Sequence, residues 1–169
     1  MTKLFTMKMK NSAVLVVLFW LFSQIGVHAA GLSGTYTIDP SGSGSTNYKT
    51  FTDAVADLNT NGVSGAVTFK VASGTYVEQI RIGNVSGTSK SNTVTFVSSA
   101  SDSSKVTLTY ASASTPSKNY TVELDSANFI TFKQMTISRT GSNNYGLVIH
   151  ITNEASYNSI LNCRIWGVK

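Results

Sequence analysis

The chain has one cysteine, two prolines and only 12% charged residues in 169 positions. A single cysteine, Cys163, excludes an internal disulfide, so the chain is not a small domain stapled by several bridges. No dense run of lysine and arginine is present, which argues against a nucleic-acid partner. Ser, Thr, Asn and Gly are abundant instead, and Val and Thr dominate the apolar segments, as β-structure prefers.

The first 29 residues have the pattern of a secretory signal peptide. Three lysines form a basic start, residues 13–22 are an uninterrupted apolar run, and small residues precede a cleavage point after Ala29 or Ala30. A run of ten residues is too short to cross a bilayer, which takes about 20. We therefore expect a cleaved signal, no membrane span after cleavage, and a secreted or cell-surface location.

Removal of that signal changes the charge balance of the chain. Three of the 13 basic residues and none of the 8 acidic residues lie in it, which leaves 10 against 8 and a net charge of +2. The net charge of +5 for the whole sequence therefore does not indicate an acidic partner such as nucleic acid.

The next region, residues 30–66, is predicted to hold a strand, a turn-rich loop and one short helix. Thr50 is a suitable N-cap, with Asp53 as its capping-box partner, and Gly62 is a suitable terminator. Three apolar residues fall at i, i+4 and i+7 and form one stripe: Phe51, Val55 and Leu58. We expect this helix to cap the N-terminal end of the structure that follows.

From residue 67 to residue 169 the sequence repeats itself about every 27 residues. Each repeat has two pairs of apolar residues separated by turn material: Val67/Phe69 with Ile80/Ile82, Val94/Phe96 with Val106/Leu108, Val122/Leu124 with Met135/Ile137, and Ile149/Ile151 with Cys163/Ile165. A repeat of this length is typical of a solenoid, in which each unit stacks on the next.

A β-sandwich and a right-handed parallel β-helix both accommodate many short strands. The sandwich does not require that equivalent positions of successive repeats be alike, whereas the β-helix stacks them in one internal column. Two such columns are visible: Val67/Val94/Val122/Ile149 and Ile82/Leu108/Ile137/Ile165. We therefore predict an all-β protein, a right-handed parallel β-helix of about four coils with a short N-terminal capping helix.

The C-terminal end is predicted to be open. The last residues, 166–169, directly follow a core strand, and no amphipathic helix covers them. An uncovered strand edge is prone to pairing, and short solenoids need covered ends. We expect an N-terminal fragment of a longer protein, capable of end-to-end self-association through this edge.

The sequence around the helix and the first repeat carries a family resemblance. Tyr48-x-x-Phe51-x-x-Ala54-Val55, followed by VTFKVASGTYVEQI at 67–80, resembles the opening of the pectin-lyase-like β-helix superfamily, in particular large secreted β-helix proteins of Bacteroidetes-type bacteria. The element Gly74-x-Tyr76-x-Glu78 resembles the first motif of pectin methylesterases. The resemblance implies the β-helix fold over roughly residues 34–165.

The resemblance does not extend to the catalytic motifs. Pectin methylesterases use two aspartates and an arginine on later coils with glutamine-containing motifs, and the sequence has no Gln-Ala-Val, Gln-Asp or Gly-Arg-Pro-Trp. We therefore interpret Gly74 and Tyr76 as residues of turn geometry and packing rather than of substrate contact.

Stacked coils also align outward residues. One predicted outward column is Thr68, Thr95, Glu123 and His150, with neighbours about 4.8 Å apart. Glu123 and His150 are therefore the candidates for catalysis, as a carboxylate that orients an imidazole. No nucleophile or second acid is evident beside them, and the alternative is a cross-strand polar pair on a solvated face.

Two further outward columns are candidates for binding acidic polysaccharide: Gln79, Lys105, Gln134 and Asn162, and Arg81, Thr107, Thr136 and Arg164. The alternative is that they are the polar surface that any water-exposed β-helix shows. Cys163 falls inward beneath Met135 and is interpreted as a small buried apolar residue. No metal-ligand spacing or phosphate loop is visible, so we predict no metal and no cofactor.

Three hypotheses for function remain. The first is an exported or cell-surface β-helix module, non-catalytic as it stands, that contacts polysaccharide. The second is the N-terminal part of a carbohydrate-active enzyme, of pectin lyase or esterase type, whose catalytic coils are missing. The third is a truncated gene product with no independent function. The absence of paired acidic residues in a shared groove favours the first.

Overall fold

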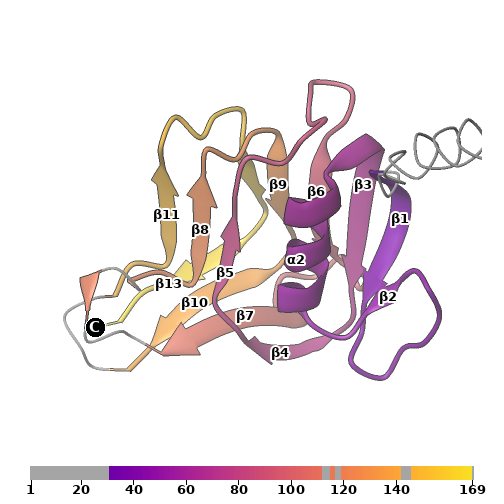
Figure 1. Cartoon of the computed structure of the whole chain (residues 1–169). Helices are drawn as coiled ribbons and strands as arrows, with labels where there is room; N and C mark the ends of the chain where they lie inside the picture. The colour runs from indigo at the N-terminus through magenta and orange to yellow at the C-terminus, as the bar shows by residue number, and fades with distance from the viewer. Residues whose placement is uncertain (1–30, 112–114, 117–118, 142–145, 169) are drawn as a thin grey trace, which may run out of the picture.

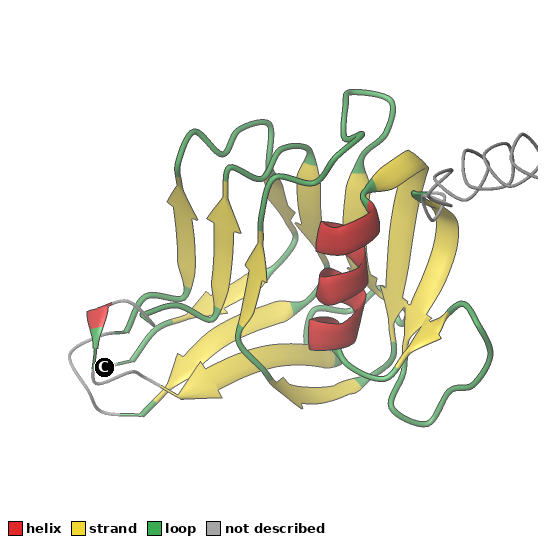
Figure 2. Ribbon diagram, viewed as in Figure 1, coloured by secondary structure: helices red, strands yellow, loops and turns green. Residues whose placement is uncertain are grey.

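The computed structural model of the chain describes residues 31–111, 115–116, 119–141 and 146–168, so the predicted signal peptide lies outside the described residues. The elements are β1 (Leu32–Ile38), β2 (Asn47–Tyr48), α2 (Phe51–Asn61), β3 (Val63–Val71), β4 (Gly74–Val77), β5 (Ile80–Ile82), β6 (Val94–Ser98), β7 (Val106–Ala111), β8 (Val122–Asp125), β9 (Ile130–Lys133), β10 (Thr136–Thr140), β11 (Ile149–Thr152), β12 (Ser159–Leu161) and β13 (Arg164–Trp166). Strands wind around one core, and the helix lies beside them (Figure 2).

The strands form three sheets, and every pairing between strands is parallel. Sheet A has the order β12-β9-β6-β3-β1-β2, sheet B the order β13-β10-β7-β4, and sheet C the order β11-β8-β5. The first three coils, beginning with β3, β4 and β5, each contribute one strand to each sheet in turn, and β12 and β13 then add to sheets A and B (Figure 1). The predicted parallel β-helix of about four coils is confirmed.

The predicted columns are only half right, because each coil holds three strands and not two. Val67 pairs with Val94 as predicted, but Val94 then pairs with Ile130. Val122 instead pairs with Ile80 and Ile149 in sheet C. The segment between β7 and β8 is long, so a prediction with two strands in each repeat aligns β8 with β6 when its true neighbour is β5.

The second predicted column is corrected at one position. Leu108, Ile137 and Ile165 pair in sheet B as predicted. The first member of this column is Tyr76, whereas Ile82 pairs with Leu124 in sheet C. The column is therefore aromatic at its N-terminal end.

The core is a stack of side chains from successive coils. The rings of Phe69, Phe96 and Phe132 are nearly parallel, with centroids 4.8 and 5.1 Å apart, and are almost completely buried. Phe51 of α2 packs beside the middle ring of the stack, with its ring centroid 5.9 Å from that of Phe96. Parallel pairing in register places like rings at about the strand spacing, which is a favourable separation for aromatic pairs.

Helix α2 starts and ends where the sequence predicts. The Oγ1 of Thr50 accepts the N–H of Asp53 at 3.0 Å, as in a capping box. Gly62 follows the helix with φ +64° and donates its N–H to the Leu58 carbonyl at 3.0 Å. This φ favours glycine because it has no Cβ.

Backbone N–H groups in the first turn of α2 are hydrogen-bonded by a side chain of the first coil. The Glu78 carboxylate accepts the N–H of Phe51 at 3.1 Å and the N–H and hydroxyl of Thr52 at 2.8 and 2.6 Å. An acidic group at a helix N-terminus also interacts favourably with the helix dipole. Glu78 therefore fixes the start of the helix on the coil that the helix covers.

Tyr76, the other side chain of the predicted motif, has a packing role. Its ring is buried edge-on against Phe51, with centroids 5.1 Å apart, and its hydroxyl donates to the carbonyl of Ala72 at 2.9 Å. Burial raises the pKa of Tyr76 to about 12. Together with Glu78, it makes the Gly74-x-Tyr76-x-Glu78 element a means of seating α2.

The buried face of α2 covers the N-terminal coil. It packs against β5, β1 and β2, and its buried residues are Phe51, Ala54, Val55 and Leu58. In Figure 1 the helix lies alongside β5.

Within the described part of the chain, no helix combines the length and apolar character needed to span a membrane.

The last coil exposes its inward side chains. Ile151, Ile160 and Ile165 are 53%, 40% and 47% exposed. Their partners one coil earlier, which are Leu124, Phe132 and Ile137, are at most 1% exposed. Apolar surface exposed together with unpaired strand edges favours association.

We predict that replacing Glu78 with Ala lowers the free energy of unfolding by about 1–2 kcal/mol, because three hydrogen bonds at the helix N-terminus are lost. Urea denaturation followed by circular dichroism measures the change. Glu154→Ala, at an exposed turn, is the matched control. A loss no larger than that of the control contradicts the capping role.

We also predict that the chain self-associates through its last coil. Replacing Ile151 and Ile165 together with Asn lowers the apolar surface there and shifts the protein toward monomer in sedimentation equilibrium. Val77→Asn removes an apolar residue that is 69% exposed on the outside of sheet B and serves as control. An unmodified chain that stays monomeric at high concentration refutes the prediction.

Candidate functional site on sheet C

The outer face of sheet C carries a row of charged side chains. The parallel register sets Arg81 opposite Glu123, and Glu123 opposite His150. Asp125 lies two residues further along β8 and shares this outward face, because strand residues alternate between the two faces of a sheet. The predicted contact between Glu123 and His150 is thus brought about by neighbouring strands.

Glu123 lies between the Arg81 guanidinium and the His150 imidazole. Its Oε1 is 2.8 Å from Nε of Arg81, and its Oε2 is 2.9 Å from Nδ1 of His150. The Glu123 side chain is only 14% exposed, whereas those of Arg81 and His150 are 58% and 42% exposed. The carboxylate therefore orients both side chains and leaves much of their surface to solvent.

Asp125 also has two partners. One oxygen is bound by Nη2 of Arg81 and the other accepts Nδ2 of Asn153 at 2.6 Å. The hydrogen bond from Asn153 lowers the pKa of Asp125 most, and the charge of Arg81 lowers it further. Reciprocally, Asp125 is the main reason why the pKa of Arg81 is raised, with Glu123 contributing less. Arg81 is therefore clamped between two carboxylates.

This arrangement fixes both carboxylates in place. Each oxygen of Glu123 and of Asp125 has an ion-pair or hydrogen-bond partner among the described residues, and each has a further lone pair. The Nε2 of His150 has no hydrogen-bond partner among the described residues. No hydroxyl or thiol of the described residues is hydrogen-bonded to His150.

The predicted binding columns are partly reassigned. Thr107, Thr136 and Arg164 pair in sheet B as predicted. Arg81 does not join them, because β5 belongs to sheet C. The two-strand repeat concealed this, since it took β5 as the equivalent of β7 and did not recognise β4 as a strand.

The other predicted binding column is likewise divided between two sheets. Lys105, Gln134 and Asn162 each precede a strand of sheet B and are equivalent positions of successive coils. Gln79 precedes β5 in sheet C, and its Nε2 donates to the carbonyl of Tyr120 at 2.6 Å. Gln134 likewise donates to a backbone carbonyl, that of Ser101, at 3.1 Å. These two amides therefore brace neighbouring turns.

Cys163 is half-buried, not fully buried as predicted, because no coil covers it. Burial raises the pKa of its thiol, which disfavours the reactive thiolate. Within the described ranges no group of three or more His, Cys, Asp and Glu residues is placed to hold a metal ion.

Sequence reasoning missed the contacts of Arg81 with Glu123 and Asp125. These contacts become visible once each coil is divided into three strands, because Arg81 and Glu123 then lie in the same sheet. Once β5 is aligned with β8, the pattern Ile-Arg-Ile over Val-Glu-Leu shows the opposite charges in register.

No protein-family model matches the sequence, and no curated protein matches it. Among solved structures, the fold is similar to that of the pectin methylesterase from Aspergillus niger in deglycosylated form, with a TM-score of 0.57 and 20% sequence identity. The match covers 81% of this chain and 46% of that one, so the chain spans less than half of its length. The likeness shows the fold alone, a parallel β-helix.

We predict that Asp125→Asn reduces the loss of folding stability that occurs as the pH falls below neutral. The pKa of Asp125 is lowered in the folded state, so its contribution is present at neutral pH and is lost as the pH falls through that lowered pKa. The variant should be less stable than the unmodified chain at neutral pH and similar to it at about pH 2. Thermal melts across this range measure the difference. Glu154→Gln, at an exposed turn, should leave the profile unchanged, and an equally steep profile in Asp125→Asn refutes the prediction.

Proposed function

We propose that this chain is an exported or cell-surface β-helix module that contacts polysaccharide and is not itself catalytic. The observation that carries the proposal is that Arg81, His150 and Asn153 hold Glu123 and Asp125 in a row of ion pairs and hydrogen bonds. Among the described residues, no hydroxyl or thiol nucleophile is hydrogen-bonded to His150 in this row. The basic and apolar segments at the start of the sequence support export.

Two features support polysaccharide as the partner. The outer face of sheet C presents Arg81 and His150, each more than one-third exposed and each held in place by Glu123. Fixed donors on a straight surface suit an extended chain of sugars with carboxylate or hydroxyl groups. The similar solved structure is, by its name, a methylesterase of pectin, which is itself a polysaccharide.

The alternative is that the chain is the N-terminal part of a carbohydrate-active enzyme of pectin lyase or esterase type. The similar methylesterase is more than twice the length of the matched region, which favours this alternative. In that case the row on sheet C would bind substrate beside catalytic groups on later coils.

A screen of pectins and other uronic-acid polymers for both retention and turnover distinguishes the two functions. We expect the chain to be retained on an acidic polymer and to release no product. Arg81→Ala should weaken retention by about tenfold, because an arginine contact with an anion is removed, while Lys70→Ala on sheet A serves as control. Turnover that Glu123→Ala or His150→Ala abolishes would overturn the non-catalytic assignment.

A further inference from the structure

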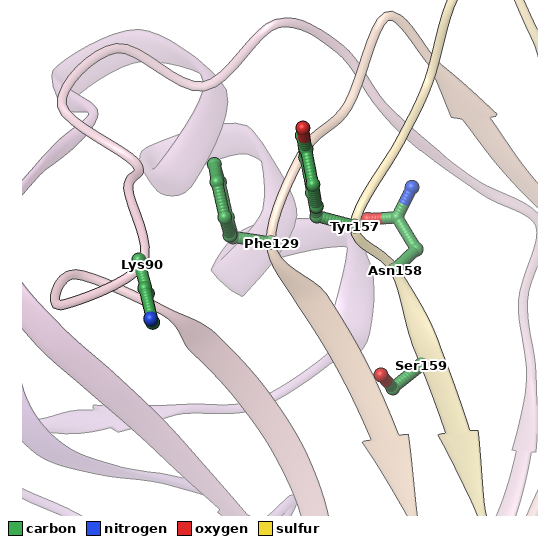
Figure 3. A pocket seen from close by; sticks show the side chains of 5 residues that line it. All are labelled: Lys90, Phe129, Tyr157, Asn158 and Ser159. Carbon is green, nitrogen blue, oxygen red and sulfur yellow. The ribbon is translucent and has the colours of Figure 1, made fainter.

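The turns that lead from sheet C into sheet A carry two stacked aromatic rings outside the core. Phe129 precedes β9 and Tyr157 occupies the turn before β12 on the next coil. Their ring centroids are 4.9 Å apart and the ring planes differ by 4°. Figure 3 shows both rings standing parallel to each other above the start of these strands.

The position of these rings is unfavourable for structure alone. Tyr157 is 75% exposed, so its ring gains little from burial. Both residues have positive φ, +61° for Phe129 and +56° for Tyr157, a conformation that bulky side chains rarely adopt. Strained residues of this kind are concentrated at functional sites.

The rings border a shallow pocket between the loop before β6 and the start of β12. Its lining residues are Lys90, Phe129, Tyr157, Asn158 and Ser159. In Figure 3 Phe129 lies between Lys90 and Tyr157, in agreement with the order β6-β9-β12 in sheet A. The face of the Phe129 ring that Tyr157 does not cover is therefore turned toward Lys90.

The polar residues of the pocket differ in whether their side chains are held by hydrogen bonds to the backbone. Asn158 is committed, because its Oδ1 accepts the N–H of Ile130 at 3.0 Å and its Nδ2 donates to the carbonyl of Ala127 at 2.9 Å. Lys90 is exposed and has no ion pair with any described residue. The hydroxyl of Ser159 points outward from sheet A, in register with Thr131.

We propose that this pocket binds a sugar ring that carries an anionic substituent, either a carboxylate or a sulfate. The C–H groups of one face of a pyranose ring pack against the electron-rich face of an aromatic ring. Lys90 lines the same pocket on the side of Phe129 away from Tyr157 and supplies an ammonium for the anionic group, and Ser159 supplies a hydroxyl for a sugar oxygen. Phe129 and Tyr157 already stack on each other, which disfavours insertion of a nucleic-acid base between them.

This inference rests on the proposed function and adds a second contact surface to it. The stacked rings lie in the turns that follow β8 and β11, beyond the ends of the sheet C strands. A polysaccharide chain bound at the pocket would thus be held by apolar ring contact and one cation. The row on sheet C offers charge alone.

Calorimetric titration of the purified chain tests the site with three oligosaccharides of equal length: a uronic-acid oligomer, a sulfated oligomer and a neutral oligomer. We expect Tyr157→Ala and Phe129→Ala each to weaken binding by at least about tenfold. Tyr157→Phe should bind as the unmodified chain does, which separates ring stacking from loss of fold. Trp166→Ala, an aromatic residue 60% exposed on β13, is the control.

Lys90→Ala should weaken binding of the anionic oligomers and reduce its salt dependence, while Lys70→Ala, at an exposed position of β3, should not. The better-bound anionic oligomer identifies the substituent. Equal affinity for the neutral oligomer, unaffected by Lys90→Ala, overturns the anionic assignment. If the chain binds acidic polymer but the ring variants bind it equally well, the pocket is refuted and the proposed function stands. If the unmodified chain binds no polysaccharide, the proposed function itself fails.

Discussion

The stacking of equivalent side chains on neighbouring coils is the constraint on which this structure depends. Phe69, Phe96 and Phe132 repeat at the spacing of parallel strands, so each ring is buried only if the next coil keeps its register. A shift of one residue would turn every inward side chain outward. The same constraint aligns Arg81, Glu123 and His150 outside, so the candidate site is a by-product of core packing.

The class of fold was predictable because the repeat is strong and the inward residues are apolar. The number of strands in each coil was not predictable from it. Tyr76 and Ile80 lie close together in sequence but belong to different sheets, and a bend between two short strands leaves no hydrophobic signature. The helix, in contrast, was predictable at both ends, because Thr50 and Gly62 act locally.

The contact between Glu123 and His150 was predictable for a limited reason. Both residues lie in the same sheet, and in that part of the chain the repeat length is regular. The role of Arg81 was missed because it depends on the alignment of β5 with β8, whose paired residues Ile80 and Val122 are 42 residues apart and do not follow the 27-residue repeat. Glu78 as the acceptor for the first turn of α2 was also missed, since Asp53 is nearer in sequence.

The seating of α2 has a consequence for the order in which the chain assembles. Glu78 and Tyr76 follow the helix in sequence and hold it from the first coil, and β5 packs against it, so α2 can be seated once the chain has been made through β5. Each later coil then needs only its predecessor as a template. Parallel pairing of distant segments is slow when unaided, and a covered first coil converts it into stepwise growth in one direction.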